Sequence, residues 1–74
     1  MSAHTVEKLV YMANQIARNV THEPDPVAMI ADHIHAFWSA RMKADVFAVL
    51  DGPAGAALEP TARAALDRLA AHAC

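Results

Sequence analysis

The sequence has little of several residue types on which common functions depend. Two glycines are too few for a phosphate-cradling loop, and a single cysteine, Cys74, excludes an internal disulfide. The six lysines and arginines are spread along a chain of formal charge −2, so there is no basic stripe to follow a nucleic-acid backbone. The longest uncharged stretch, Leu9 to Ala17, is too short and too polar to span a bilayer. We therefore expect neither a nucleic-acid nor a membrane partner.

Two further observations concern the cellular compartment. Glu7 stands where a signal peptide would have its apolar run, so we expect no export. The lone thiol of Cys74 fits a reducing environment. Together they predict a cytoplasmic protein.

What the chain has in quantity is alanine. Hydrophobic residues make up 55% of its 74 residues, but 18 of them are alanine and only 22 are Val, Ile, Leu, Met, Phe, Trp or Tyr. This composition favours helices but supplies little buried volume. Small domains of this kind usually gain stability from a disulfide, a metal or a partner. We expect one domain, residues 1–74, that depends on a metal or a partner or is only marginally stable.

Apolar residues at helical spacing predict an all-α fold, a small bundle of three to five short helices. The first helix is predicted to begin near Thr5 as its N-cap and to end before Pro24, since the residue before a proline avoids helical backbone. Its predicted core stripe is Val6, Leu9, Val10, Ala13, Ile16, Ala17 and Val20.

A second helix is predicted from Asp25-Pro26, a capping residue followed by a proline at the first helical position. If it continued, Arg41 and Asp45 would fall on its apolar stripe, so a break capped by Ser39 is predicted; one bent helix from Pro26 to Leu50 is the alternative. The predicted stripe of this second helix is Val27, Ile30, Ala31, Ile34, Phe37 and Trp38.

The third segment carries Met42, Val46, Val49 and Leu50. An exposed turn over residues 51–55 is predicted from its glycines and proline, and a last helix from Pro60.

The histidines do not form a recognisable metal site. His33 and His35 are two residues apart, so on a helix they point about 200° away from each other. Asp32 and His35 form a possible pair, but a tetrahedral site needs two more ligands and none is near in sequence. No serine or cysteine has a histidine at a spacing that would activate it. We predict no catalytic, cofactor-binding or metal-binding residue in this chain.

The back of the first helix is the most informative surface. A solvated face is normally rich in Lys and Glu, but this face offers an aromatic, amides and an arginine, residue types typical of interfaces. Tyr11 could instead pack beneath the loop before Pro24.

Phe37 and Trp38 could likewise face either the core or a partner, and Trp38 is favoured as core because it lies centrally on its stripe. Arg41 could cap the carbonyls of the preceding helix or pair with a partner's carboxylate. The candidate interface residues are Lys8, Tyr11, Met12, Asn14, Gln15, Arg18, His33, Phe37, Trp38, Arg41 and Met42.

Several blocks of the sequence are more specific than a generic amphipathic pattern. They are Lys8-Leu9-Val10-Tyr11-Met12-Ala13-Asn14-Gln15-Ile16-Ala17, Ile30-Ala31-Asp32-His33-Ile34, Phe37-Trp38, Arg41-Met42, residues 52–55 and Ala65-Leu66-Asp67-Arg68-Leu69. In combination they resemble the delta subunit of the soluble, multi-subunit NAD-dependent formate dehydrogenases of bacteria. The resemblance covers about residues 5–69. Ser39-Ala40 stand where that family usually has Asp-Pro.

The resemblance implies a role without chemistry of its own. In that family the complex oxidises formate to carbon dioxide with reduction of NAD. The alpha subunit carries bis-molybdopterin guanine dinucleotide (with molybdenum or tungsten) and iron–sulfur clusters, while beta and gamma carry FMN and further clusters. The delta subunit is implied to be a cofactor-free accessory that stabilises or assembles the alpha subunit. A transient maturation chaperone for cofactor insertion is the alternative, and a free-standing helical dimer is a third.

The first prediction concerns metal content. Purified protein should contain no stoichiometric zinc, iron or molybdenum, because no two histidines share a helix face at ligand spacing. Elemental analysis after dialysis against a chelator tests this. One retained equivalent of any metal would contradict it.

The second prediction separates interface from core. Tyr11→Ala or Arg18→Glu should leave the isolated fold nearly unchanged but weaken association with the large subunit, Tyr11→Ala by about 1–3 kcal/mol. Leu9→Ala or Ile34→Ala should instead destabilise the fold by about 2–4 kcal/mol through cavity formation. Thermal unfolding of the free chain and pull-down of the complex measure the two effects. If Tyr11→Ala unfolds the chain as Leu9→Ala does, Tyr11 is a core residue.

Overall fold

The computed structural model describes the backbone of residues 2–72 and the side chains of residues 6–72. Its secondary structure is a succession of helices. These residues contain no strand, so the predicted all-α fold is confirmed. In chain order the helices are α1 (Ser2–Asn19), α2 (Pro26–Phe37), α3 (Ala40–Phe47), α4 (Pro53–Ala56) and α5 (Pro60–His72).

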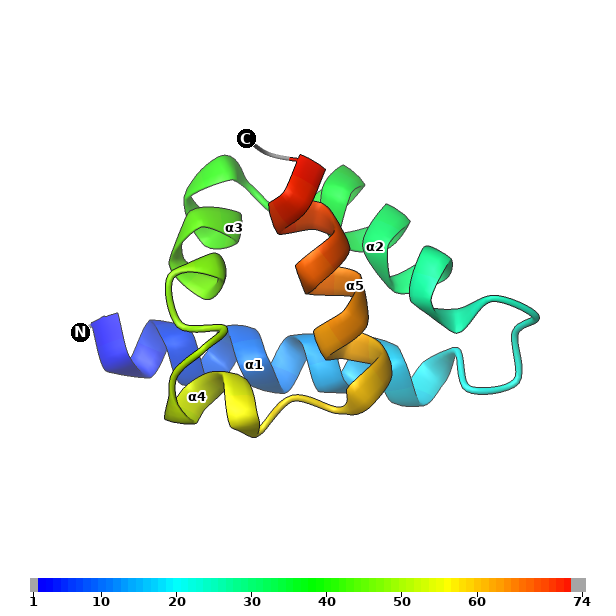
Figure 1. The fold of residues 1–74 in the computed structure, drawn as a ribbon, viewed down its shortest axis with the longest axis horizontal. Helices are drawn as coiled ribbons and strands as arrows, with labels where there is room; N and C mark the ends of the chain where they lie inside the picture. The colour runs from blue at the N-terminus through cyan, green and yellow to red at the C-terminus, as the bar shows by residue number, and fades with distance from the viewer. Residues whose placement is uncertain (1, 73–74) are drawn as a thin grey trace.

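The helices are arranged around α5 (Figure 1). The long helix α1 runs along one side of the molecule and contacts each of the other four helices. Helix α5 packs most extensively on α2 and also contacts α1 and α3. Within the described residues, no helix combines the length and apolar character that crossing a membrane requires.

Helices α2 and α3 begin directly after the predicted capping residues. Asp25 is the N-cap of α2, and its Oδ1 accepts a hydrogen bond from the backbone N–H of Ala28 at 3.1 Å. Helix α2 ends at Phe37, and Trp38 has extended backbone with φ −88° and ψ 141°. Ser39 then caps α3 by accepting from the N–H of Met42 at 3.1 Å. The predicted break is confirmed, and the alternative of one bent helix is wrong.

Two predicted boundaries were wrong. Helix α1 begins at Ser2, so Thr5 lies inside the helix and not at its N-cap. The residues before Thr5 include neither proline nor glycine, so nothing there stops a helix from extending. Residues 51–55 are not only a turn, because Pro53 begins the single-turn helix α4 with Gly52 at its N-cap. Nor is this segment exposed throughout, since Gly55 is buried.

The core is assembled from one face of each long helix. Its largest fully buried side chains are Ile30, Ile34, Val46 and Leu66. The other buried hydrophobic residues are Leu9, Val10, Ala13, Ala17, Ala31, Trp38, Leu50, Leu58, Ala62 and Ala65. Many of these are alanines, which let helix backbones approach closely but add little buried area.

One stripe prediction failed at the end of α2. Phe37 was placed on the predicted core stripe and also among the candidate interface residues; its side chain is 74% exposed, which contradicts the first placement and agrees with the second. The chain leaves the helix directly after Phe37, and Trp38, only 5% exposed, occupies the core instead. The assignment of Trp38 to the core is confirmed.

Gly55 is required where α4 passes close to the backbone of Leu50, in the turn after α3. A Cβ added at Gly55 would overlap the carbonyl oxygen of Leu50 and lie 2.6 Å from its carbonyl carbon. Both atoms belong to the backbone, so relief would require a shift of the chain itself. At Gly52 the nearest atom to an added Cβ, the carbonyl oxygen of Val49, is 3.6 Å away, an ordinary contact.

This contrast predicts opposite outcomes for two matched substitutions. Gly55→Ala should lower the free energy of unfolding by about 1–3 kcal/mol, as other overpacking changes do. Gly52→Ala should change it by much less, because there is room for the methyl group. Urea unfolding of the two variants measures both values. Equal stability of the two would contradict the close approach of α4 to Leu50.

Candidate partner-binding surface

The candidate interface residues do not form one surface. Some lie on the outer side of α1, some lie at the corner where α2 meets α3, and others are held by contacts within the chain. Three of them pack against or within the core: Met12, Trp38 and Met42. Trp38 is therefore removed from the candidate surface, and Met12 and Met42 are only partly accessible.

Asn14 connects α1 to the segment before α5. Its side-chain Oδ1 accepts from the backbone N–H of Glu59 at 2.7 Å, and its Nδ2 donates to the carbonyl oxygen of Ala57 at 3.0 Å. Both groups of this half-buried amide are thus used inside the molecule. Asn14 was expected at the edge of a partner surface, but it is a structural residue. Its contacts join positions more than forty residues apart in the sequence, so helical spacing alone gave no sign of them.

Tyr11 lies on the outer side of α1 and is 61% exposed. It borders a shallow hollow of about 300 Å³ together with Ala54 and Ala57, and its hydroxyl accepts a hydrogen bond from Gln15 Nε2 at 2.7 Å. The alternative that Tyr11 packs beneath the loop before Pro24 is wrong, because its neighbours come from α4 and the residue that follows it.

Arg18, farther along the same side of α1, forms an ion pair with Glu59 at 3.3 Å. The side chains of Arg18 and Glu59 are 61% and 38% exposed, so solvent screens the pair and it adds little stability. Lys8 is exposed near the other end of the helix. The α1 side of the candidate set is therefore polar, and Arg18 and Gln15 are already engaged.

A more apolar surface lies on α2. Met29, His33 and Phe37 are spaced four residues apart, so they follow one another along one side of the helix. Met29 is 45% exposed, Phe37 is 74% exposed, and His33 is also exposed. The rings of His33 and Phe37 are in contact, with centroids 4.8 Å apart and planes tilted by 37°. We call these three residues the α2 stripe. Met29 was missed from the sequence, although its four-residue spacing to His33 was a usable signal.

Arg41 does not take the capping role considered for it, and its pairing with a partner's carboxylate stays a prediction. It forms an ion pair with Asp45 of its own helix at 3.6 Å, and its side chain is 87% exposed. The carbonyl oxygen of His35, near the end of α2, instead accepts a hydrogen bond from Lys43 Nζ at 3.3 Å. A cation at the C-terminal end of a helix is favourable there, so Lys43 takes the capping role considered for Arg41.

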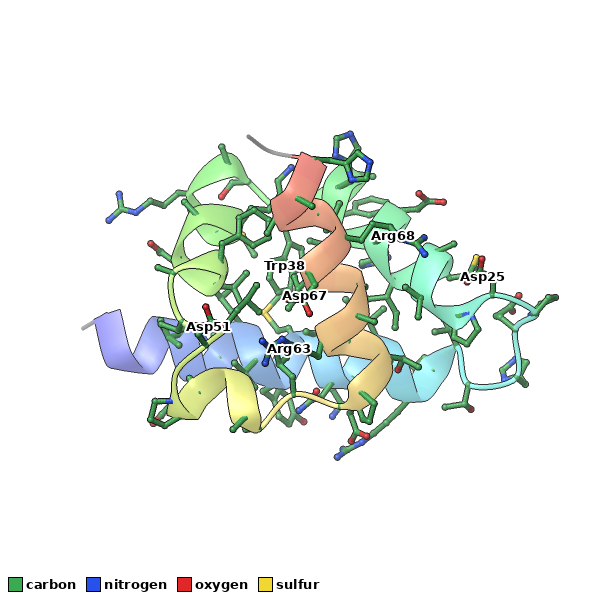
Figure 2. The ribbon with its side chains drawn as sticks, viewed as in Figure 1. Asp25, Trp38, Asp51, Arg63, Asp67 and Arg68 are labelled. Atoms are coloured by element: carbon green, nitrogen blue, oxygen red, sulfur yellow. The ribbon has the colours of Figure 1, made fainter. Side chains whose placement is uncertain are left out.

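Charged groups elsewhere form surface ion pairs. Figure 2 shows Arg63 close to Asp51 and Asp67; Arg63 pairs with Asp51 at 3.3 Å and with Asp67 at 3.2 Å. The Arg63–Asp51 pair connects α5 to the turn before α4. In the part of the chain whose side chains are described, no three His, Cys, Asp or Glu residues are grouped to hold a metal ion. The same residues include no buried side-chain nitrogen or oxygen without a hydrogen bond.

Comparison with known proteins finds a matching family. Residues 8–66 match the model of the family described as the NADH-dependent formate dehydrogenase delta subunit, FdsD. The matched span includes all of α2, α3 and α4 and most of α1 and α5. No curated protein and no solved structure matches the chain. Since the match covers most of the sequence, the chain belongs to the FdsD family, the delta subunits of NADH-dependent formate dehydrogenase.

Proposed function

We propose that this chain is a non-catalytic accessory subunit that docks on the molybdopterin-bearing alpha subunit of formate dehydrogenase and stabilises it. Membership of the delta-subunit family supports a place among partner subunits. On this proposal the molybdenum or tungsten centre, the iron–sulfur clusters and FMN belong to the alpha, beta and gamma subunits. The complex would act in the cytoplasm.

The observation that carries the proposal is the α2 stripe. A chain with few large apolar residues leaves two of them, Met29 and Phe37, exposed on one side of one helix. Aromatic residues are enriched among the anchors of protein interfaces. The contact with His33 also restricts the Phe37 ring before any partner arrives, which reduces the entropy lost on binding. The stripe therefore has the properties of a preformed anchor.

The outer side of α1 supports the proposal less directly. Tyr11 is exposed, but its hydroxyl is bonded to Gln15, and Arg18 is paired with Glu59. A partner would have to break or extend these contacts to use them. We therefore place the main contact on the α2 stripe and a supporting contact on Lys8, Tyr11, Gln15 and Arg18.

The alternative role is a maturation chaperone that leaves once the cofactor is inserted. The two roles predict different compositions for the finished enzyme. A permanent subunit remains in fixed ratio with the alpha subunit in active complex, whereas a chaperone is found only with cofactor-free alpha subunit. Quantifying the chain in purified active enzyme distinguishes them.

The interface prediction compares the same substitution, phenylalanine to alanine, at Phe37 and at Phe47. Phe37→Ala should weaken association with the rest of the complex by about 1–3 kcal/mol, as for an aromatic interface anchor. It should leave thermal unfolding of the free chain nearly unchanged, because Phe37 is 74% exposed. The same truncation at Phe47, which packs against the core, should lower the unfolding temperature of the free chain.

Association is measured by titrating the purified chain into complex that lacks it. Normal binding by Phe37→Ala would place the docking surface elsewhere. A loss of stability as large as that of Phe47→Ala would make Phe37 a structural residue, and either result contradicts the proposal for the α2 stripe.

A further inference from the structure

A separate groove lies between α3 and α5. It has a volume of about 400 Å³ and a floor of apolar side chains, those of Ala40, Ala44, Phe47 and Leu69. The end of α2, the start of α3 and the end of α5 meet at this end of the molecule (Figure 1). The remaining lining residues are His35, Lys43 and His72.

Among the described residues, Lys43 is the one charged side chain that lines the groove. Lys43 uses one N–H of its ammonium group on the carbonyl oxygen of His35, and none of the ion pairs in the described chain includes it. The Nδ1 atom of His72 lies 2.8 Å from the carbonyl oxygen of Arg68, a contact that requires the proton on Nδ1. Among the described residues, no aspartate or glutamate lines the groove. An anion placed at its edge would therefore meet a cation without competition from a neighbouring carboxylate.

The groove is distinct from the α2 stripe. His35, which lines it, is two residues from both His33 and Phe37 and so points about 200° away from each around the helix axis. The two surfaces lie on opposite sides of the end of α2. A partner that reaches both would hold this end of the molecule at two places.

We propose that this groove binds a short acidic segment of a partner polypeptide. An apolar side chain of the segment would contact Phe47 and Leu69, and a neighbouring carboxylate would pair with Lys43. A volume of about 400 Å³ lies near the lower end of ligand-pocket sizes, which suits a few side chains rather than a whole helix. The charge of the rim selects acidic over basic segments. That the segment belongs to another subunit of formate dehydrogenase rests on the proposed function.

The test uses the full chain and two synthetic probes. The acidic probe is the peptide Ac-Asp-Leu-Phe-Glu-NH2 and the matched basic probe is Ac-Lys-Leu-Phe-Lys-NH2. Titration of the isotope-labelled chain, followed by amide chemical shifts, should place the acidic peptide at Ala44, Phe47 and Leu69. The basic peptide should bind at least about tenfold more weakly, because it brings like charge to the rim.

Two variants and one control establish the site. Lys43→Glu should weaken the acidic peptide about tenfold by reversing the rim charge. Ala44→Phe, a change at an exposed position, should block the floor of the groove and abolish the shifts. Lys8→Glu makes the same charge change on α1 and should alter the affinity by less than about twofold.

Three results would overturn the proposal: no binding of the acidic peptide at millimolar concentration, equal binding of the basic peptide, or binding that survives Ala44→Phe. Because these measurements use the free chain, they do not depend on the proposed function. If the wild-type chain fails to associate with the enzyme complex, the proposed function fails while the peptide result stands on its own.

Discussion

The close packing of α5 on α2 is the constraint on which the rest of the structure depends. Ala62 and Ala65 are fully buried, as are Ile30 and Ile34, and α2 and α5 share the most extensive helix contact in the molecule. Alanine on the contact face lets two helix backbones approach closely, but it contributes little apolar area. The same contact positions α3 beside α5 and leaves the outer side of α2 free. Both proposed binding surfaces therefore follow from where α5 lies.

Contacts outside the apolar core also connect α5 to the rest of the molecule. Asn14 holds the segment that leads into α5, and Arg63 connects α5 to the turn before α4. Gly55 permits the close approach of α4 to the backbone of Leu50, and the segment that leads into α5 begins directly after α4. We expect a molecule with so thin a core to have little stability to spare. A partner that binds only the folded form would add stability by mass action, which is consistent with an accessory subunit.

The sequence predicted most of what depends on local chemistry, apart from the start of α1 at Ser2, and missed what depends on distant contacts. Asp25 and Ser39 acted as caps as expected, since capping involves residues only three positions apart. The role of Asn14 depends on residues more than forty positions away, and the exposure of Phe37 depends on how the chain turns after α2. For the same reason Tyr11 could be assigned to the surface only once the position of α4 was known.

The central claim is that the α2 stripe is where this delta subunit meets the alpha subunit. A structure of the assembled active complex by electron cryomicroscopy tests it most directly. The account predicts that the chain is present and that the side chain of Phe37, 74% exposed in the free chain, is buried against the alpha subunit. A mature complex in which Phe37 remains in solvent, or from which the chain is absent, would contradict it.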